Sequence, residues 1–187
     1  MLVKQGRTNE ALAQAETALS IDPVTPTTGG HYALALIAAG RHAAAIEQAW
    51  LIEKLEPDYQ LVNWILFLAH LRGGDYVSAI AAGERFRART NLPWVWGDLG
   101  YAYAMAGQKP QAVKLLEELQ RHPPPVVFQI AEIQAGLGMK QEALTNLEVA
   151  FTQRSEDLGW LKFLPAFDSL RAEPRFQALL KRVGLEP

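Results

Sequence analysis

The stretch PWVWGDLGYAYAMAGQKPQAVKLLEELQRHPP, residues 93–124, decides the fold class of this chain. Two segments of helical length, about 94–106 and 109–121, lie on either side of Gly107, and prolines stand at both ends of the stretch. Glycine is the residue best suited to the left-handed conformation that ends many helices, and proline marks the point where a helix stops or starts. The stretch therefore predicts two helices that fold back on each other at Gly107.

The same arrangement recurs along the chain, which indicates a repeat protein. Its glycines are spaced 34, 34, 33 and 31 residues apart, at Gly6, Gly40, Gly74, Gly107 and Gly138. Five residues after each glycine stands an alanine, at Ala11, Ala45, Ala79, Ala112 and Ala143. A small side chain at that place allows two helix axes to approach closely. The pattern predicts helices at about 8–20, 26–39, 42–55, 59–72, 76–89, 94–106, 109–121, 125–137 and 140–153.

The period and several residues of 93–124 resemble the tetratricopeptide repeat. The matching residues are Trp96, Leu99, Gly100, Tyr103, Gly107, Ala112 and Pro124. The resemblance covers residues 1–154 and implies an all-α fold, an α-α superhelix or solenoid. About four and a half helix-turn-helix repeats are expected, the first of them truncated, and a capping helix at the C-terminus.

Residues 155–187 leave the repeat pattern and are expected to form a C-terminal capping segment. Pro174 suits the first turn of a helix, and the apolar stripe behind it comprises Phe176, Leu179, Leu180 and Val183. A compact apolar stretch precedes that helix, at Leu161, Leu164, Phe167 and Leu170. The sequence of this segment resembles the end of bacterial multidomain proteins in which such repeats follow a DNA-binding, cyclase or kinase domain. We therefore expect the chain to be a fragment of a larger bacterial protein.

The tetratricopeptide resemblance implies a partner-binding groove lined by the first helix of each hairpin. The expected groove residues are Leu34, Trp64, Leu68, Arg72, Trp94, Tyr101, Met105, Phe128 and Glu132. This stripe is apolar and aromatic, as binding surfaces often are. Some of these residues are expected to pack in the core instead, whereas Trp64, Trp94, Tyr101 and Phe128 are expected to be exposed. The Lys and Asn clamp for acidic peptide tails is missing, which favours an apolar partner segment.

Composition and motifs argue against other classes of function. Hydrophobic residues make up 49% and charged residues 20%, and the net charge is -2; a basic nucleic-acid-binding face is not expected. There is no cysteine, and the longest apolar stretch, Leu61–Leu71, is far shorter than the roughly 20 residues of a membrane span. No catalytic motif or metal-binding histidine spacing is present. We expect a cytoplasmic protein that is not an enzyme and holds no cofactor or metal.

Two readings of function remain open, with a third less favoured. The first is a protein-interaction module that binds a partner protein or peptide. The second is a regulatory or sensor domain of a bacterial transcription regulator or signalling enzyme. An RNA-binding repeat protein is disfavoured by the acidic isoelectric point of about 6.1. A homodimer is a further expectation, because the helix at 8–20 lacks an upstream partner for the face that carries Leu12, Ala15 and Leu19.

Overall fold

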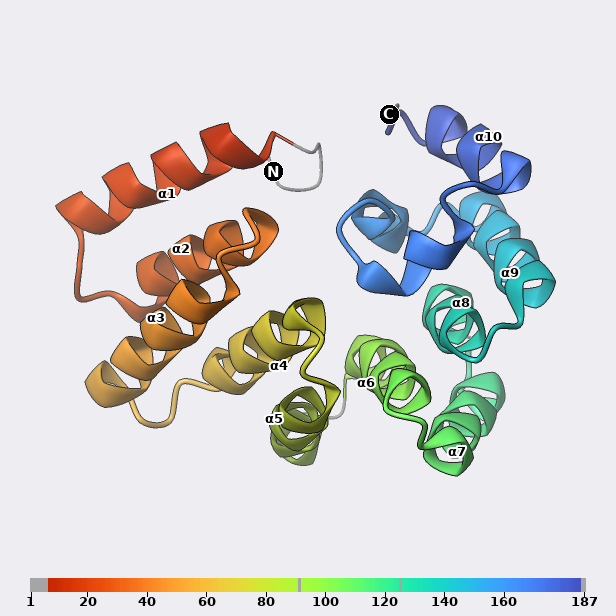
Figure 1. The fold of residues 1–187 in the computed structure, drawn as a ribbon, viewed down its shortest axis with the longest axis horizontal. Helices are drawn as coiled ribbons and strands as arrows, with labels where there is room; N and C mark the ends of the chain where they lie inside the picture. The colour runs from red at the N-terminus through yellow and green to blue at the C-terminus, as the bar shows by residue number, and fades with distance from the viewer. Residues whose placement is uncertain (1–6, 91, 125, 186–187) are drawn as a thin grey trace. The chain divides into compact units, whose positions relative to one another are not determined.

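Every regular element is helical in the computed structural model, which describes residues 7–90, 92–124 and 126–185 (Figure 1). No β-strand occurs in those three ranges, so the prediction of an all-α helical-repeat fold is confirmed. The chain divides into two compact units, Met1–Thr90 (unit 1) and Asn91–Pro187 (unit 2). The repeat spacing did not predict this division, because the period continues across it.

Unit 1 is a run of antiparallel helices in which each helix packs against the next one in the sequence. Its helices are α1 (Thr8–Ile21), α2 (Pro26–Ala38), α3 (His42–Leu55), α4 (Leu61–Gly73) and α5 (Tyr76–Arg89). The helix α2 also packs against α4, so the first helices of successive hairpins form an inner layer. This layer is the part of unit 1 to which the predicted binding residues belong.

Unit 2 repeats the scheme and then departs from it. Its α-helices are α6 (Pro93–Met105), α7 (Lys109–Arg121), α8 (Val127–Gly136), α9 (Lys140–Thr152) and α10 (Pro174–Arg182). The inner helices α6 and α8 pack directly on each other, and α7 and α9 pack behind them. Between α9 and α10 the chain forms two 3₁₀ helices, η1 (Glu156–Trp160) and η2 (Pro165–Leu170). The observed bounds of the repeat helices lie within two residues of the predicted ones.

The turn inside each hairpin has the geometry that the glycine pattern predicts. At Gly107 the backbone is left-handed, with φ 77°. The N–H of Gly107 donates to the carbonyl of Ala104 at 3.1 Å, and the N–H of Gln108 donates to that of Tyr103 at 2.9 Å. This pair of bonds satisfies carbonyls that the helix end would leave without a partner. Equivalent glycines with positive φ stand at Gly40, Gly74 and Gly138, whereas Gly6 lies outside the described residues.

The alanines five residues later are buried where the helices cross. Ala45, Ala79, Ala112 and Ala143 are fully buried, and Ala11 is buried too. In α1, Leu12 is also buried, while Ala15 and Leu19 are half-buried. The face on which a homodimer was expected is therefore partly covered by unit 1 itself, since α1 packs on α2.

The C-terminal helix α10 begins at Pro174, as predicted, and packs on α9. Phe176, Leu179 and Leu180 are buried, and Phe176 lies 6.2 Å from Phe167 between ring centroids. The four apolar residues that were expected to form a compact stretch are also buried: Leu161, Leu164, Phe167 and Leu170. The apolar side chains of this segment thus extend the core of unit 2 beyond the last hairpin.

Candidate functional site

The predicted binding residues of unit 1 come from the inner helices α2 and α4. Leu34 on α2 and Trp64 and Arg72 on α4 are half-buried, so part of each side chain faces solvent. Leu68 is buried, which means that it belongs to the core and not to an exposed binding face. Of the four residues expected in this unit, Leu34, Trp64 and Arg72 are therefore the ones that keep partial exposure to solvent. We call these three residues the unit 1 face.

The unit 1 face owes its position to the packing of α4. This helix contacts α3, α5 and α2, and most of its apolar residues are buried against them. Trp64, Leu68 and Arg72 recur every four residues, so they share one side of the helix. Leu61, one turn before Trp64, is 39% exposed and extends the apolar part of that side toward the start of α4. Tertiary packing thus buries Leu68 in the middle of this side and leaves Leu61, Trp64 and Arg72 in partial contact with water.

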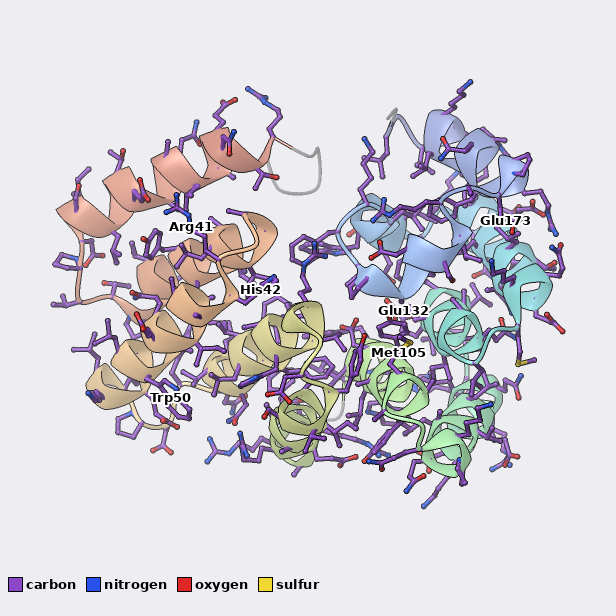
Figure 2. All side chains as sticks on the ribbon, in the orientation of Figure 1. Arg41, His42, Trp50, Met105, Glu132 and Glu173 are labelled. Atoms are coloured by element: carbon purple, nitrogen blue, oxygen red, sulfur yellow. The ribbon has the colours of Figure 1, made fainter. Side chains whose placement is uncertain are left out.

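The charge at the Arg72 end of this side of α4 is set by neighbouring histidines and acids. His42, at the start of α3 (Figure 2), has a pKa held below its usual value by burial and then by the charge of Arg72. His70 Nδ1 lies 3.3 Å from Asp75 Oδ2. The pKa of Asp75 is also lowered, chiefly by the hydrogen bond from Ser78. At neutral pH this end therefore combines the cation of Arg72 with a neutral His42.

In unit 2 the predicted residues lie on α6 and α8, and most of them are buried. Trp94 is half-buried and Met105 is 42% exposed, whereas Tyr101, Phe128 and Glu132 are 6%, 2% and 2% exposed (Figure 2). The expectation that Tyr101 and Phe128 are exposed is wrong. Glu132 likewise does not face an open groove.

The covering is done by residues 156–170, which we call the covering segment. Its η2 helix packs on α8 (Figure 1), and the ring of Phe167 meets that of Phe128 edge to face at 5.3 Å. The hydroxyl of Tyr101 donates to the carbonyl of Pro165 at 3.3 Å. An aromatic contact and a backbone hydrogen bond are the interactions that a bound peptide makes. The covering segment thus occupies this inner face as an intramolecular ligand would.

Two buried acids beneath the covering segment, Asp98 and Glu132, form with Asp157 of that segment a group that we call the carboxyl cluster. Asp98 comes from α6, Glu132 from α8 and Asp157 from η1. Asp98 Oδ1 and Glu132 Oε2 are buried and have no hydrogen-bond partner among the described residues. Asp157 Oδ2 accepts from Gln129 Nε2 at 3.2 Å and from the Ser155 hydroxyl at 3.3 Å.

Burial strongly perturbs the pKa of two acids of this cluster, Asp98 and Glu132. Burial, followed by the charge of Asp157, raises the pKa of Asp98 from 3.8 to about 7. Burial, followed by the charges of Asp98 and Asp157, raises the pKa of Glu132 well above its usual value. A carboxyl group transferred out of water without a cationic partner favours its neutral form. Burial therefore favours the neutral forms of Asp98 and Glu132.

Two glycines of α6 make room for α8 and for the carboxyl of Glu132. A Cβ atom at Gly97 would lie 1.9 Å from Glu132 Oε2 and 2.9 Å from the backbone Cα of Gln129. A Cβ atom at Gly100 would lie 2.4 Å from Ile133 Cδ1. Gly100 matches the repeat pattern, but Gly97 does not. Its absent side chain leaves the space that the buried carboxyl occupies.

The sequence analysis missed the carboxyl cluster, although a signal for it exists. Asp98 is the one charged residue of α6, and Glu132 is the one charged residue of α8. A lone acid within an apolar helix is unusual unless it is paired or functional. Asp157 carried no comparable signal, because it lies among polar residues after α9.

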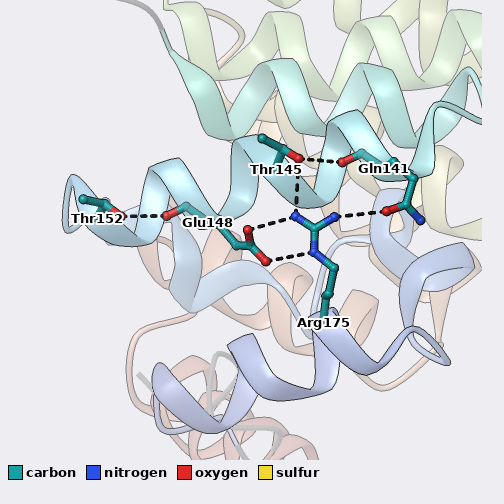
Figure 3. Close-up of polar contacts among 5 residues, drawn as sticks. All are labelled: Gln141, Thr145, Glu148, Thr152 and Arg175. Atoms are coloured by element: carbon teal, nitrogen blue, oxygen red, sulfur yellow. Dashed lines mark hydrogen bonds and ion pairs between the residues drawn. The ribbon is translucent and has the colours of Figure 1, made fainter.

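A polar clasp holds α10 to α9 on the outer side of unit 2 (Figure 3). Arg175 donates to both carboxylate oxygens of Glu148, at 3.0 and 2.9 Å, and also to Gln141 and Thr145. The hydrogen bond from Arg175 lowers the pKa of Glu148. Because these groups are largely exposed, the pair contributes little to stability and serves mainly to orient α10.

Neither a candidate metal site nor a candidate membrane-spanning helix occurs among the described residues. Over residues 7–90, 92–124 and 126–185, no group of three or more histidines and acids has the arrangement of a metal site, the carboxyl cluster included. None of the helices in these ranges combines the length and apolar character that crossing a bilayer requires. In comparisons with known proteins, neither a family model nor a curated protein matches the chain.

Proposed function

We propose that this chain is a tetratricopeptide-type interaction module that binds an apolar segment of a partner protein on the unit 1 face. We also propose that the module is part of a larger bacterial, cytoplasmic protein, because the sequence of residues 155–187 resembles the end of such proteins. The glycine and alanine period supports the repeat type. The half-buried Leu34, Trp64 and Arg72 support the binding role, because Trp and Arg are the side chains that most often dominate interfaces.

The observation that carries the proposal is the covering segment of unit 2. Residues 156–170 lie on α8 through aromatic and backbone contacts, and they are not part of any hairpin. An inner face of this repeat type is thus suited to an apolar, non-repeat segment. In unit 1 the equivalent inner helices are α2 and α4, which carry the half-buried Leu34, Trp64 and Arg72. We infer that a segment of similar chemistry, supplied by a partner, is the ligand there.

The test is a selection of displayed peptides on the full chain, followed by affinity measurements with three proteins. Replacing Trp64 with alanine is expected to weaken binding of selected peptides by about 30-fold, the effect of losing about 2 kcal/mol at an interface hot spot. The matched control is Trp50→Ala, because Trp50 is 45% exposed on α3 and belongs to no proposed site (Figure 2).

The Trp50 variant should bind as the unaltered chain does, and circular dichroism should show the same helix content for all three proteins. Equal affinity of the Trp64 and Trp50 variants for every selected peptide would place the binding surface elsewhere. Loss of binding by both variants to the same degree would point to nonspecific adhesion through aromatic side chains, and it would also contradict the proposal.

A further inference from the structure

The covering segment brings one acid of its own, Asp157, toward two acids of the inner helices of unit 2. Asp157 on η1 belongs to the covering segment, and Asp98 and Glu132 belong to the helices beneath it. The charges that act on Asp98 and Glu132 are those of other members of this carboxyl cluster. Like charges brought together in a buried place repel one another more strongly than they do in water. The closed arrangement is therefore compatible with protonated acids and costly for ionised ones.

The charged groups on the other elements around α8 do not offset this repulsion. On α7, Lys109, Lys114 and Arg121 are exposed. Charged groups of the neighbouring elements form four ion pairs: Glu117 with Arg121, Lys140 with Glu173, Glu148 with Arg175, and Asp168 with Arg171. Glu142 and Glu156 are exposed, and Glu118 on α7 and Lys162 beyond η1 are half-buried. None of these cations contributes to the pKa of Asp98 or Glu132.

We propose that residues 156–170 form a proton-controlled lid, which stays closed over α6 and α8 while Asp98 and Glu132 are protonated and opens when they ionise. Opening lets water reach the carboxylates and separates Asp157 from the other two acids. It also uncovers the ring of Phe128 and the hydroxyl of Tyr101, which the lid covers when closed. This inference goes beyond the proposed function, because it concerns unit 2 and holds whether or not the unit 1 face binds a peptide.

The geometry gives the lid a definite direction of response. Burial and the unpartnered oxygens of Asp98 and Glu132 favour the neutral acids in the closed state. In the open state these acids regain water and ionise near their usual pH. For each proton released on opening, an increase of one pH unit raises the population of the open state by about tenfold, as linkage requires. With the pKa of Asp98 at about 7 in the closed state, this rise occupies the range below pH 7. Glu132, whose pKa is also raised by burial, adds to the same response.

Hydrogen exchange of the full chain between pH 5 and pH 8 tests the lid directly. The reporting amides are those of Leu161, Phe163 and Leu164, which donate to backbone carbonyls inside the covering segment. After correction for intrinsic exchange, their protection is expected to fall at least about tenfold from pH 5 to pH 7. Amides of α4 in unit 1 serve as the internal reference and should show no such change.

The deciding variant is Asp98→Asn combined with Glu132→Gln, which keeps the shape of both side chains and removes their charge. Its lid amides should keep the same protection from pH 5 to pH 8. The matched control is Glu156→Gln, since Glu156 is an exposed acid on the same lid, next to Asp157; this variant should respond to pH as the unaltered chain does. If the double variant does not fold, Asp157→Asn replaces it and should reduce the fall in protection.

Two results would contradict the proposal of a proton-controlled lid. One is protection of the lid amides that does not change with pH in the unaltered chain. The other is a fall in protection that persists unchanged in the neutral variant, because the acids would then not be its cause. Neither result depends on peptide binding, so a failure of the lid is distinguishable from a failure of the proposed function.

Discussion

Replacing Asp98 with asparagine is expected to remove a large part of the pH dependence of stability in unit 2. Asp98 is 6% exposed on α6, and its Oδ1 has no hydrogen-bond partner among the described residues. Burial and then the charge of Asp157 raise its pKa from 3.8 to about 7. Asparagine has nearly the same shape and no charge. The variant therefore measures what it costs the folded chain to ionise this acid.

The sign and size follow from the two pKa values. The unfolded chain loses the Asp98 proton near pH 3.8, and the folded chain loses it near pH 7. Between these values the folded state binds more protons, so the free energy of unfolding falls as pH rises. The contribution is fully present below pH 3.8, is lost as pH rises to about 7, and does not change further above it. At 1.36 kcal/mol per pH unit, the loss amounts to about 4 kcal/mol as an upper value, because relaxation around the charge lowers its cost.

Chemical unfolding of the full chain and of the Asp98→Asn variant, at pH 4 and at pH 8, measures this loss. The stability of the variant relative to the unaltered chain should increase by about 2–4 kcal/mol from pH 4 to pH 8. Any packing cost of the asparagine amide is the same at both pH values and cancels in this comparison. Exchange of the α6 amides identifies the transition that belongs to unit 2. A constant difference between the two proteins at all pH values would refute the reasoning.

Three further changes test the packing. Ala79→Leu or Ala112→Leu should lower stability by about 1–3 kcal/mol, because both alanines are fully buried where helices cross; unchanged melting temperatures for both would contradict the assigned repeat. Deleting residues 172–187 removes the buried Phe176 and should lower the melting temperature or the solubility, whereas melting and elution identical to those of the full chain would mean that α10 is not a cap. Arg154→Gly should raise stability by about 0.5–1 kcal/mol, since Arg154 has a left-handed backbone, with φ 57°; a lower stability by chemical unfolding would show that its side chain matters more than this strain.

The repeat glycines and alanines were sufficient to predict the helices and their hairpins from the sequence. The reason is local: a left-handed glycine such as Gly107 ends a helix through bonds to residues only a few places earlier. The alanine that follows, such as Ala112, then fixes where the returning helix crosses. The cap was predictable in the same way, because Pro174 starts α10 and the apolar residues behind it recur at helical spacing.

Only the tertiary structure shows which side chains of the inner helices are buried and which are exposed. Helical spacing places Trp64, Tyr101 and Phe128 on inner helices alike, but it does not show which of them is covered. Tyr101 and Phe128 are buried because η2, more than 30 residues later in the sequence, lies over them, whereas Trp64 on α4 is half-buried. The raised pKa of Glu132 has the same origin. The burial of a side chain and the pKa of a buried acid depend on tertiary contacts between residues that are distant in the sequence. The local pattern that forms a helix does not determine those contacts.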